Sequence, residues 1–220
     1  MIINLLNYSK LNFLSHIPSA LSMLDYIDVL FTEKYIVPFK DKIILGKPFG
    51  SQTYYLVWKD CGYLDGIKNL SVGVKHNEIP FVDFSEETMG NALGVATGIA
   101  MATPTDTVYV NLSDASLQMG STLEAIAYIG AKQLKNIVVT VDYNQMQVTG
   151  KTGDIICIKP ISNLFKDYGW TVIGAIQPDS FDDPAPSEVA RLIDQVKAEN
   201  VTTIFGSEVF PSAVLEEVGR

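Results

Sequence analysis

Apolar, strand-like runs that alternate with helix-like segments constrain this chain more than any other feature. The runs Thr107–Leu112 and Asn136–Asp142 are candidate strands, and residues 116–132 between them favour a helix. Farther along, residues 161–168 favour a helix and residues 170–173 a strand. The run Asn136–Asp142 is almost continuously apolar, as is typical of strands covered on both faces. The pattern predicts an α/β fold, namely a doubly wound parallel sheet with helices on both faces.

The same rules predict the elements before and after this core. A helix is expected to begin at Ile17, where Pro18 suits the first turn, and to end near Tyr35. Further expected elements are a strand over 43–45, a helix over 52–60, a loop-rich stretch over 64–85 and a helix rich in small residues over 86–102. We predict a single domain over residues 1–220, in which residues 176–220 form a helix-strand-helix tail that completes the sheet.

Composition narrows the classes of partner. A net charge of -9 argues against a nucleic-acid or anionic-membrane partner. No run of about 18 uninterrupted apolar residues is present, so we expect no membrane span. The first residues, Met1–Asn7, have neither a basic start nor a cleavage signal, so no secretory signal is expected. The expected location is the cytoplasm.

Two polar residues follow the two central strands. Asp114 lies just beyond the first and Asn144, thirty positions later, just beyond the second. In a parallel sheet the carboxyl ends of strands border the ligand crevice. A carboxylate and an amide oxygen there suit a hard divalent cation that holds a phosphorylated cofactor. Taken singly, Asp114 is equally interpretable as a helix N-cap and Asn144 as an ordinary turn residue.

The sequence around these two residues contains longer motifs. Residues 136–150 read NIVVTVDYNQMQVTG and match the pattern NLxxxxDxNxxQxxG, while residues 119–125 correspond to a segment EGxxxEA. Upstream, residues 15–25, 45–63 and 80–98 correspond to GHxGxxLSxxD, LSKGH…LYxxLxxxGY and PGVExxxGxLGQGLxxAxG. From about residue 15 to residue 173 the chain resembles the N-terminal, diphosphate-binding domain of transketolase and related thiamine diphosphate enzymes.

The resemblance implies a set of site residues. The Asp114 carboxylate, the Asn144 side chain and the Met146 carbonyl would bind Mg²⁺ or Ca²⁺. His16 matches a histidine that lines the family's active site, although a histidine just before a helix is often only a surface residue. His76 aligns poorly with another family histidine and is expected to lie on a loop surface. The residues expected to contact thiamine diphosphate are Ser113, Asp114, Ala115, Asn144 and Met89.

The chain departs from the family pattern at several of these positions. Ser113 and Ala115 stand where the family has glycines that let the backbone approach the diphosphate. A Ser113 hydroxyl is able to bond phosphate, whereas Ala115 only adds a methyl group. Phe49 stands where the family has a histidine. Further replacements occur at Pro18, Glu87, Met119, Asn91 and Ala92.

The family's active site lies between two domains, and this chain is too short to contain the second. The resemblance therefore implies a partner subunit with a pyrimidine-binding domain, an oligomeric assembly and a sugar or sugar-phosphate substrate. The expected function is that of a transferase subunit in a split, transketolase-like enzyme that transfers a two-carbon ketol unit or performs a related carboligation. The alternative, favoured by the departures, is a non-catalytic interaction subunit that has lost cofactor binding.

Overall fold

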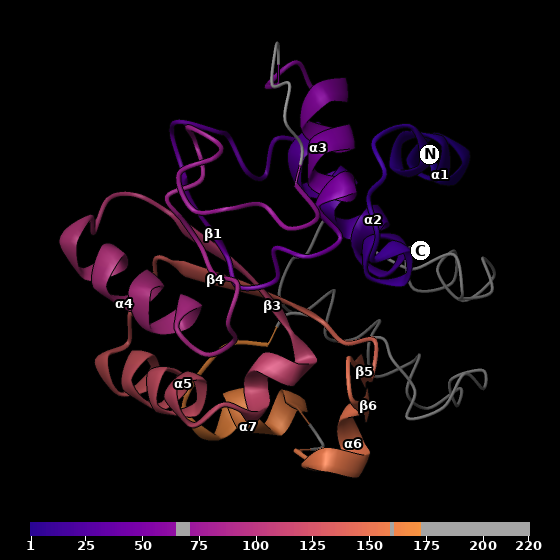
Figure 1. Ribbon diagram of the computed structural model, residues 1–220. Coiled ribbons are helices and arrows are strands. Elements are labelled where there is room, and N and C mark those ends of the chain that lie inside the picture. Colours follow the sequence, from indigo (N-terminus) through magenta and orange to yellow (C-terminus); the bar gives the residue numbers. More distant parts are fainter. Residues whose placement is uncertain (65–70, 159–160, 173–220) are drawn as a thin grey trace, which may run out of the picture.

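The computed structural model describes residues 1–64, 71–158 and 161–172 of the chain. At its centre is a sheet of four parallel strands in the order β2-β1-β3-β4 (Figure 1). These strands are β1 (Lys42–Leu45), β2 (Phe84–Ser85), β3 (Val108–Ser113) and β4 (Ile137–Asp142). The predicted strands at 43–45, 107–112 and 136–142 are therefore confirmed, while the short β2 lies in the stretch that was expected to be a loop.

Successive residues of β1 point to opposite faces of the sheet, as the pleat requires. Ile43 and Leu45 belong to one hydrophobic cluster, whereas Ile44 belongs to the other. On the first face lie α1 (Ile2–Leu11), α2 (Ile17–Thr32) and α3 (Ser51–Asp60). On the second lie α4 (Ala92–Ala102), α5 (Gly120–Lys132) and α7 (Ile161–Asp167), as Figure 1 shows. The prediction of a parallel sheet with helices on both faces is confirmed.

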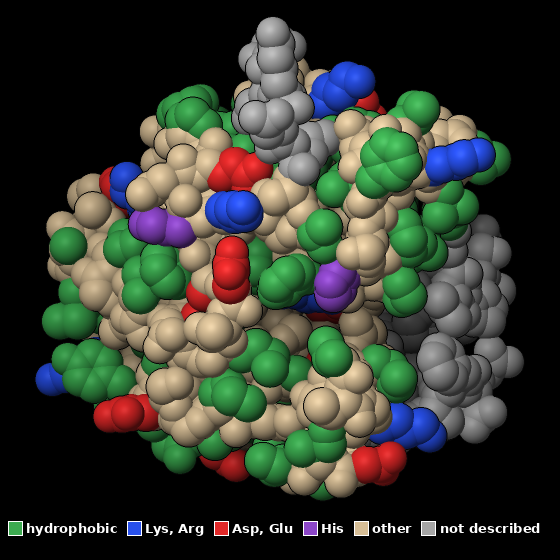
Figure 2. All heavy atoms as spheres, viewed as in Figure 1, with side chains coloured by type: hydrophobic (Ala, Val, Ile, Leu, Met, Phe, Trp, Pro, Cys, Tyr) green, Lys and Arg blue, Asp and Glu red, His purple; other side chains and the backbone are tan. Residues whose placement is uncertain are grey.

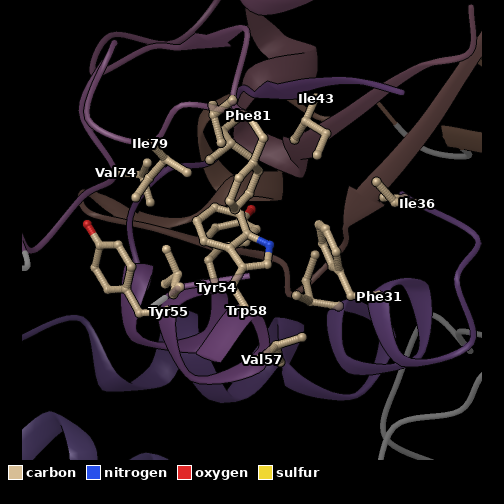
Figure 3. Close-up of a cluster of buried hydrophobic side chains, with 14 of the residues drawn as sticks. Phe31, Ile36, Ile43, Tyr54, Tyr55, Val57, Trp58, Val74, Ile79 and Phe81 are labelled. Carbon is tan, nitrogen blue, oxygen red and sulfur yellow. The ribbon is translucent and has the colours of Figure 1, made fainter. Parts of the chain in front are cut away.

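Aromatic side chains dominate the core on the first face. Trp58 of α3 is fully buried and lies at the centre of the cluster in Figure 3. Its indole meets the rings of Phe31 and Phe81 edge-on and stacks on Tyr54, with centroids 5.0 to 5.8 Å apart. Pairs of this kind add to the hydrophobic gain from burying the rings. The cluster fixes α2 and α3 against β1, and these two helices begin beside the carboxyl edge of the sheet.

Three predicted elements have different limits in the structure. The helix expected over 86–102 begins only at Ala92, because Gly90 has a φ of 118° and interrupts the helical path. The helix expected over 116–132 is divided at Met119, which has extended backbone, into a 3₁₀ turn η1 (Asp114–Gln118) and α5. The strand expected over 170–173 does not appear in residues 170–172, which form neither helix nor strand, and Ile173 lies outside the described residues.

Other elements were not predicted at all. These are α1, the small hairpin β5 (Met146–Gln147) and β6 (Gly150–Lys151), and α6 (Thr152–Ile155). The predicted tail, residues 176–220, lies outside the described residues. Within the described ranges, no helix is both long enough and apolar enough to cross a membrane.

Candidate functional site

The candidate site lies at the carboxyl edge of the sheet, where β3 and β4 end side by side. Ser113 and Asp142, the last residues of these strands, are register partners. The chain then turns into η1 on one strand and into the β5–β6 hairpin on the other. Asp114 is the first residue after β3 and Asn144 is the second residue after β4, so the predicted juxtaposition of the two segments is present. Figure 2 shows this face of the molecule, which is hollowed beside one of the two histidines.

Asp114 is a buried carboxylate with three hydrogen-bond donors. Its Oδ2 accepts from the backbone N–H of Gln145 at 2.7 Å and from the Thr152 hydroxyl at 3.2 Å. Its Oδ1 accepts from the N–H of Ala115 at 2.8 Å. Burial raises the pKa of Asp114, while these bonds and the charge of Lys47 act in the opposite direction. The residue therefore does more than cap a turn, since its carboxylate joins three separate segments.

Asn144 and Met146 form a tight turn against Asp114. The Asn144 Oδ1 atom accepts from the N–H of Met146 at 2.9 Å, in the local bond that asparagine favours in turns. Gln145 between them has a φ of 59°, and its N–H points to Asp114. The structure thus brings together the three residues that were predicted to bind a cation. All three offer oxygen atoms, two from side chains and one from the backbone.

The replaced glycine positions have local partners. Ser113 accepts at its Oγ from the N–H of Ser116 at 3.2 Å, so it serves as the N-cap of η1. The two hydroxyls, of Ser113 and Ser116, also lie 2.9 Å apart. Ala115 is 2% exposed, which places its methyl group among protein atoms rather than in the hollow. Neither side chain stands between Asp114 and the Asn144 turn.

A buried ion pair that the sequence reasoning missed lies beside these residues. Lys47, in the loop after β1, pairs with Asp142 at the end of β4, and both side chains are almost fully buried. Asp142 also accepts from the Ser22 hydroxyl at 2.5 Å and from Asn144 Nδ2 at 3.1 Å. Burial lowers the pKa of Lys47, and the charge of Asp114 opposes that shift. The only signal in the sequence is a lysine within an otherwise apolar loop.

The remaining predicted residues lie around this centre. Met89 is exposed, and its sulfur lies 3.8 Å from the Ser113 hydroxyl. His16 is the N-cap of α2, has a φ of 61° and places its ring 5.1 Å from that of Phe49. Within the described residues no hydrogen bond joins His16 to Asp114 or Asn144. His76 is exposed on a loop, next to the ring of Phe84.

The donor chemistry limits which metal site is possible here. Among the described residues there is no group of three or more His, Cys, Asp or Glu side chains that is able to hold a metal ion. A cation at this edge of the sheet would therefore depend on one carboxylate together with amide and carbonyl oxygens. Such ligands suit Mg²⁺ or Ca²⁺ rather than zinc, which prefers nitrogen and sulfur.

Comparison with known proteins connects this geometry to a family. Residues 89–208 match the family described as "Transketolase, thiamine diphosphate binding domain", and they include η1, β4 and the Asn144 turn. The chain belongs to this family. The fold agrees, because the transketolase of Leishmania mexicana superimposes with a TM-score of 0.57 at 20% identity, over 66% of this chain and 26% of that one.

Curated relatives of the chain include single subunits as well as longer enzymes. It is 23% identical over 202 residues to the 6-deoxy-6-sulfo-D-fructose transketolase subunit SqwG of a Clostridium species, covering 83% of this chain and 71% of the relative. It is 33% identical over 192 residues to the 1-deoxy-D-xylulose-5-phosphate synthase of Fusobacterium nucleatum, covering 84% and 30%. It is 29% identical over 151 residues to one of the subunits of the apulose-4-phosphate transketolase of Actinobacillus succinogenes, covering 62% and 54%.

Proposed function

We propose that this chain binds the diphosphate group of thiamine diphosphate through a divalent cation, as one subunit of a transketolase-like enzyme. The observation that carries the proposal is the 2.7 Å bond from the Gln145 N–H to Asp114 Oδ2. It holds a buried carboxylate against the turn that carries Asn144 Oδ1 and the Met146 carbonyl. These oxygens would hold Mg²⁺ or Ca²⁺, whose positive charge would attract and neutralise the diphosphate.

The residues at the site fit such a group. A carboxylate offers about four acceptor positions, so Asp114 retains capacity beyond its three donors. Lys47 adds a positive charge close to Asp114 and Asp142, where a diphosphate would bring negative charge. The Ser113 hydroxyl caps its own turn and the Ala115 methyl group is buried, so neither replacement removes a proposed cation ligand.

The cofactor, when bound, supplies the stabilised carbanion on which carbon–carbon bond transfer depends. The residues of this chain have simpler roles in the proposal. Asp114, Asn144 and Met146 bind and orient the cation, and Ser113, Met89 and the backbone of Ala115 lie against the cofactor. His16 has an exposed imidazole that no described residue engages by hydrogen bonding, so we assign it contact with the substrate or cofactor.

A partner chain completes the proposed enzyme. Met89 and Met146 of the candidate site and Val148 of the adjacent hairpin turn are exposed, and hydrophobic side chains occur around the hollow in Figure 2. Exposed apolar groups close to a site are typical of an interaction surface. Two of the relatives are named as transketolase subunits, and their names refer to sugar derivatives. We therefore propose a partner subunit that binds the pyrimidine, and two-carbon ketol transfer or a related carboligation on a sugar or sugar phosphate.

A second candidate function is a non-catalytic interaction subunit. Phe49 favours it, because its ring occupies a family histidine position and packs against His16. The hydroxyl of Ser113 also favours it, since this group is occupied within its own turn. The two functions differ in one measurable property, which is binding of thiamine diphosphate in the presence of Mg²⁺.

Calorimetric titration with thiamine diphosphate, with Mg²⁺ and with a chelator, tests the proposal. The wild-type chain is expected to bind only when the cation is present, and Asp114→Ala is expected to abolish binding. Asp154→Ala, which removes an exposed acid from α6, is the matched control and should bind normally. Absence of binding by the wild-type chain, with or without a partner, would favour the interaction subunit. Normal binding by Asp114→Ala would refute the metal site.

A further inference from the structure

Glu86 is a buried acid that neither the motif comparison nor the proposed cation site uses. It lies between β2 and α4 and is 5% exposed. Its carboxylate accepts from the backbone N–H groups of Gly90 at 3.2 Å, Asn91 at 2.7 Å and Ala92 at 2.8 Å. Its own N–H donates to the carbonyl of Leu45 at 3.1 Å, which ties it to the end of β1. One residue therefore connects the edge of the sheet, through its backbone, to the turn before α4, through its carboxylate.

These bonds hold more than the first turn of a helix. Asn91, the N-cap of α4, makes no side-chain capping bond, and Glu86 supplies the acceptor from outside the helix. A side chain that capped only the helix would accept hydrogen bonds only from the N–H groups of the first helical turn. Glu86 also takes the N–H of Gly90, which precedes the N-cap. The carboxylate consequently fixes the Met89–Gly90 turn as well as α4.

The opposite side of that turn is also held. The Ser121 hydroxyl of α5 donates to the carbonyl of Gly90 at 2.8 Å. Gly90 has a φ of 118°, and a Cβ atom at this position would lie 2.8 Å from Ser121 Oγ. The turn is thus confined between Glu86 and Ser121 in a backbone conformation that only glycine adopts without strain.

The confined turn presents Met89 to the candidate site. Met89 is 44% exposed, and its sulfur lies 3.8 Å from the hydroxyl of Ser113, the residue before Asp114. A thioether is a soft apolar surface that packs well against aromatic rings. Thiamine diphosphate carries two rings joined to its diphosphate, and these rings must lie near any site that binds the diphosphate. Met89 is the apolar side chain placed next to Ser113 for this contact.

We propose that Glu86 is a positioning residue: it holds the Met89–Gly90 turn so that Met89 contacts the ring portion of thiamine diphosphate. This inference rests on the proposed function, because it presupposes that the diphosphate binds at Asp114. It assigns a positioning role to a residue that is outside the cation site. Asp114 and the Asn144 turn hold the diphosphate end of the cofactor, whereas Glu86 acts only on the ring end, through Met89.

The test compares two ligands of the same site, inorganic pyrophosphate and thiamine diphosphate, each titrated with Mg²⁺ into the full chain by calorimetry. The wild-type chain is expected to bind thiamine diphosphate more tightly. Glu86→Ala should weaken thiamine diphosphate binding by about tenfold, which is the effect of losing roughly 1.4 kcal/mol of contact. Pyrophosphate affinity should remain within about twofold of the wild-type value, because its proposed ligands are unchanged.

Three further variants separate positioning from a general structural role. Glu87→Ala removes the same charged group from the exposed neighbouring position and should change neither affinity. Glu86→Gln keeps one acceptor oxygen and should recover part of the lost affinity. Met89→Ala changes an exposed side chain, so it should fold even if Glu86→Ala does not, and it should weaken thiamine diphosphate binding selectively.

The outcomes distinguish this inference from the proposed function. If Glu86→Ala or Met89→Ala weakens both ligands equally, or neither, the positioning role is wrong while the diphosphate site remains. If the wild-type chain binds pyrophosphate and thiamine diphosphate equally, the rings make no useful contact and the inference also fails. If the wild-type chain binds neither ligand, the proposed function itself is wrong.

Discussion

The backbone N–H of Gln145 donates to Asp114 Oδ2 at 2.7 Å, and this bond joins the segments that follow the two central strands. The Thr152 hydroxyl donates to the same oxygen at 3.2 Å from α6. The loops after β3 and β4 and the start of α6 therefore share one buried acceptor. A change at any of the three positions is expected to alter both the stability of this edge and its affinity for a cation.

Thr152→Val is the mildest such change, because it keeps the side-chain shape and removes the hydroxyl. Thr152 is buried, and the loss of its bond to Asp114 should lower the free energy of unfolding by about 1 kcal/mol. Mg²⁺-dependent binding of thiamine diphosphate should weaken while the fold is kept. Urea unfolding and calorimetry measure the two effects, with Thr105→Val at an exposed position as the control. Unchanged stability would show that this bond contributes nothing.

The pair formed by Lys47 and Asp142 should behave as a buried salt bridge. Lys47→Met leaves the Asp142 carboxylate without its cation and should cost about 3 to 5 kcal/mol in urea unfolding. The double variant Lys47→Met with Asp142→Leu should cost less than the sum of the single changes, because no unpaired charge remains. Strict additivity in this cycle would contradict a direct interaction.

A more exposed ion pair beside the same sheet provides a comparison with the buried pair. Lys42 lies 3.6 Å from Asp83, and both side chains are 30% exposed. Lys42→Met should therefore change stability by at most about 1 kcal/mol, since water screens the pair. If Lys42→Met and Lys47→Met lowered the free energy of unfolding by similar amounts, burial of the ion pair would not increase the cost of removing its lysine.

Elements whose signal is local were predictable from the sequence. The β-branched run of β4 and the proline at the start of α2 determine structure through local backbone preferences, and both elements formed as expected. The helix α4 begins later than the local pattern predicts. Its start depends on hydrogen bonds that Glu86 accepts and on the positive φ of Gly90. Glu86 and Gly90 are close in the sequence, but the sequence does not show that the Glu86 carboxylate accepts hydrogen bonds from the turn that contains Gly90.

The site was predictable to the extent that strand ends determine it. Asp114 and Asn144 follow paired parallel strands, so their proximity follows from register. The partnership of Lys47 with Asp142 joins residues 95 positions apart, and no spacing rule indicates it. The ion pair can be located only when the order of the strands and the path of the loop after β1 are known, and these are visible only in the folded structure.

Trp58 should tolerate phenylalanine much better than alanine. Its indole is fully buried within the aromatic cluster of Figure 3, and no described residue accepts a hydrogen bond from Nε1. Trp58→Ala should cost about 3 to 5 kcal/mol through the cavity it leaves. Trp58→Phe also loses contacts, but it removes an unpaired polar group whose burial costs about 1 to 3 kcal/mol. Urea unfolding should therefore show a much smaller loss for phenylalanine, and equal losses would indicate that the N–H group has a partner.

The cation-free chain should become more stable at mildly acidic pH because of Asp114. Burial raises the pKa of this carboxyl above its ordinary value of 3.8, so the folded chain binds the proton more readily than the unfolded chain. The free energy of unfolding should thus gain a contribution as pH falls through the raised pKa toward 3.8, and should lose it as pH rises. Mg²⁺ requires the ionised carboxylate, so its affinity should fall over the same interval. Thermal unfolding between about pH 4 and pH 7, with and without Mg²⁺, measures both trends. Asp114→Asn should reduce the first trend and remove the second, and an identical pH profile in that variant would assign the effect to other acids such as Glu86, whose pKa burial also raises.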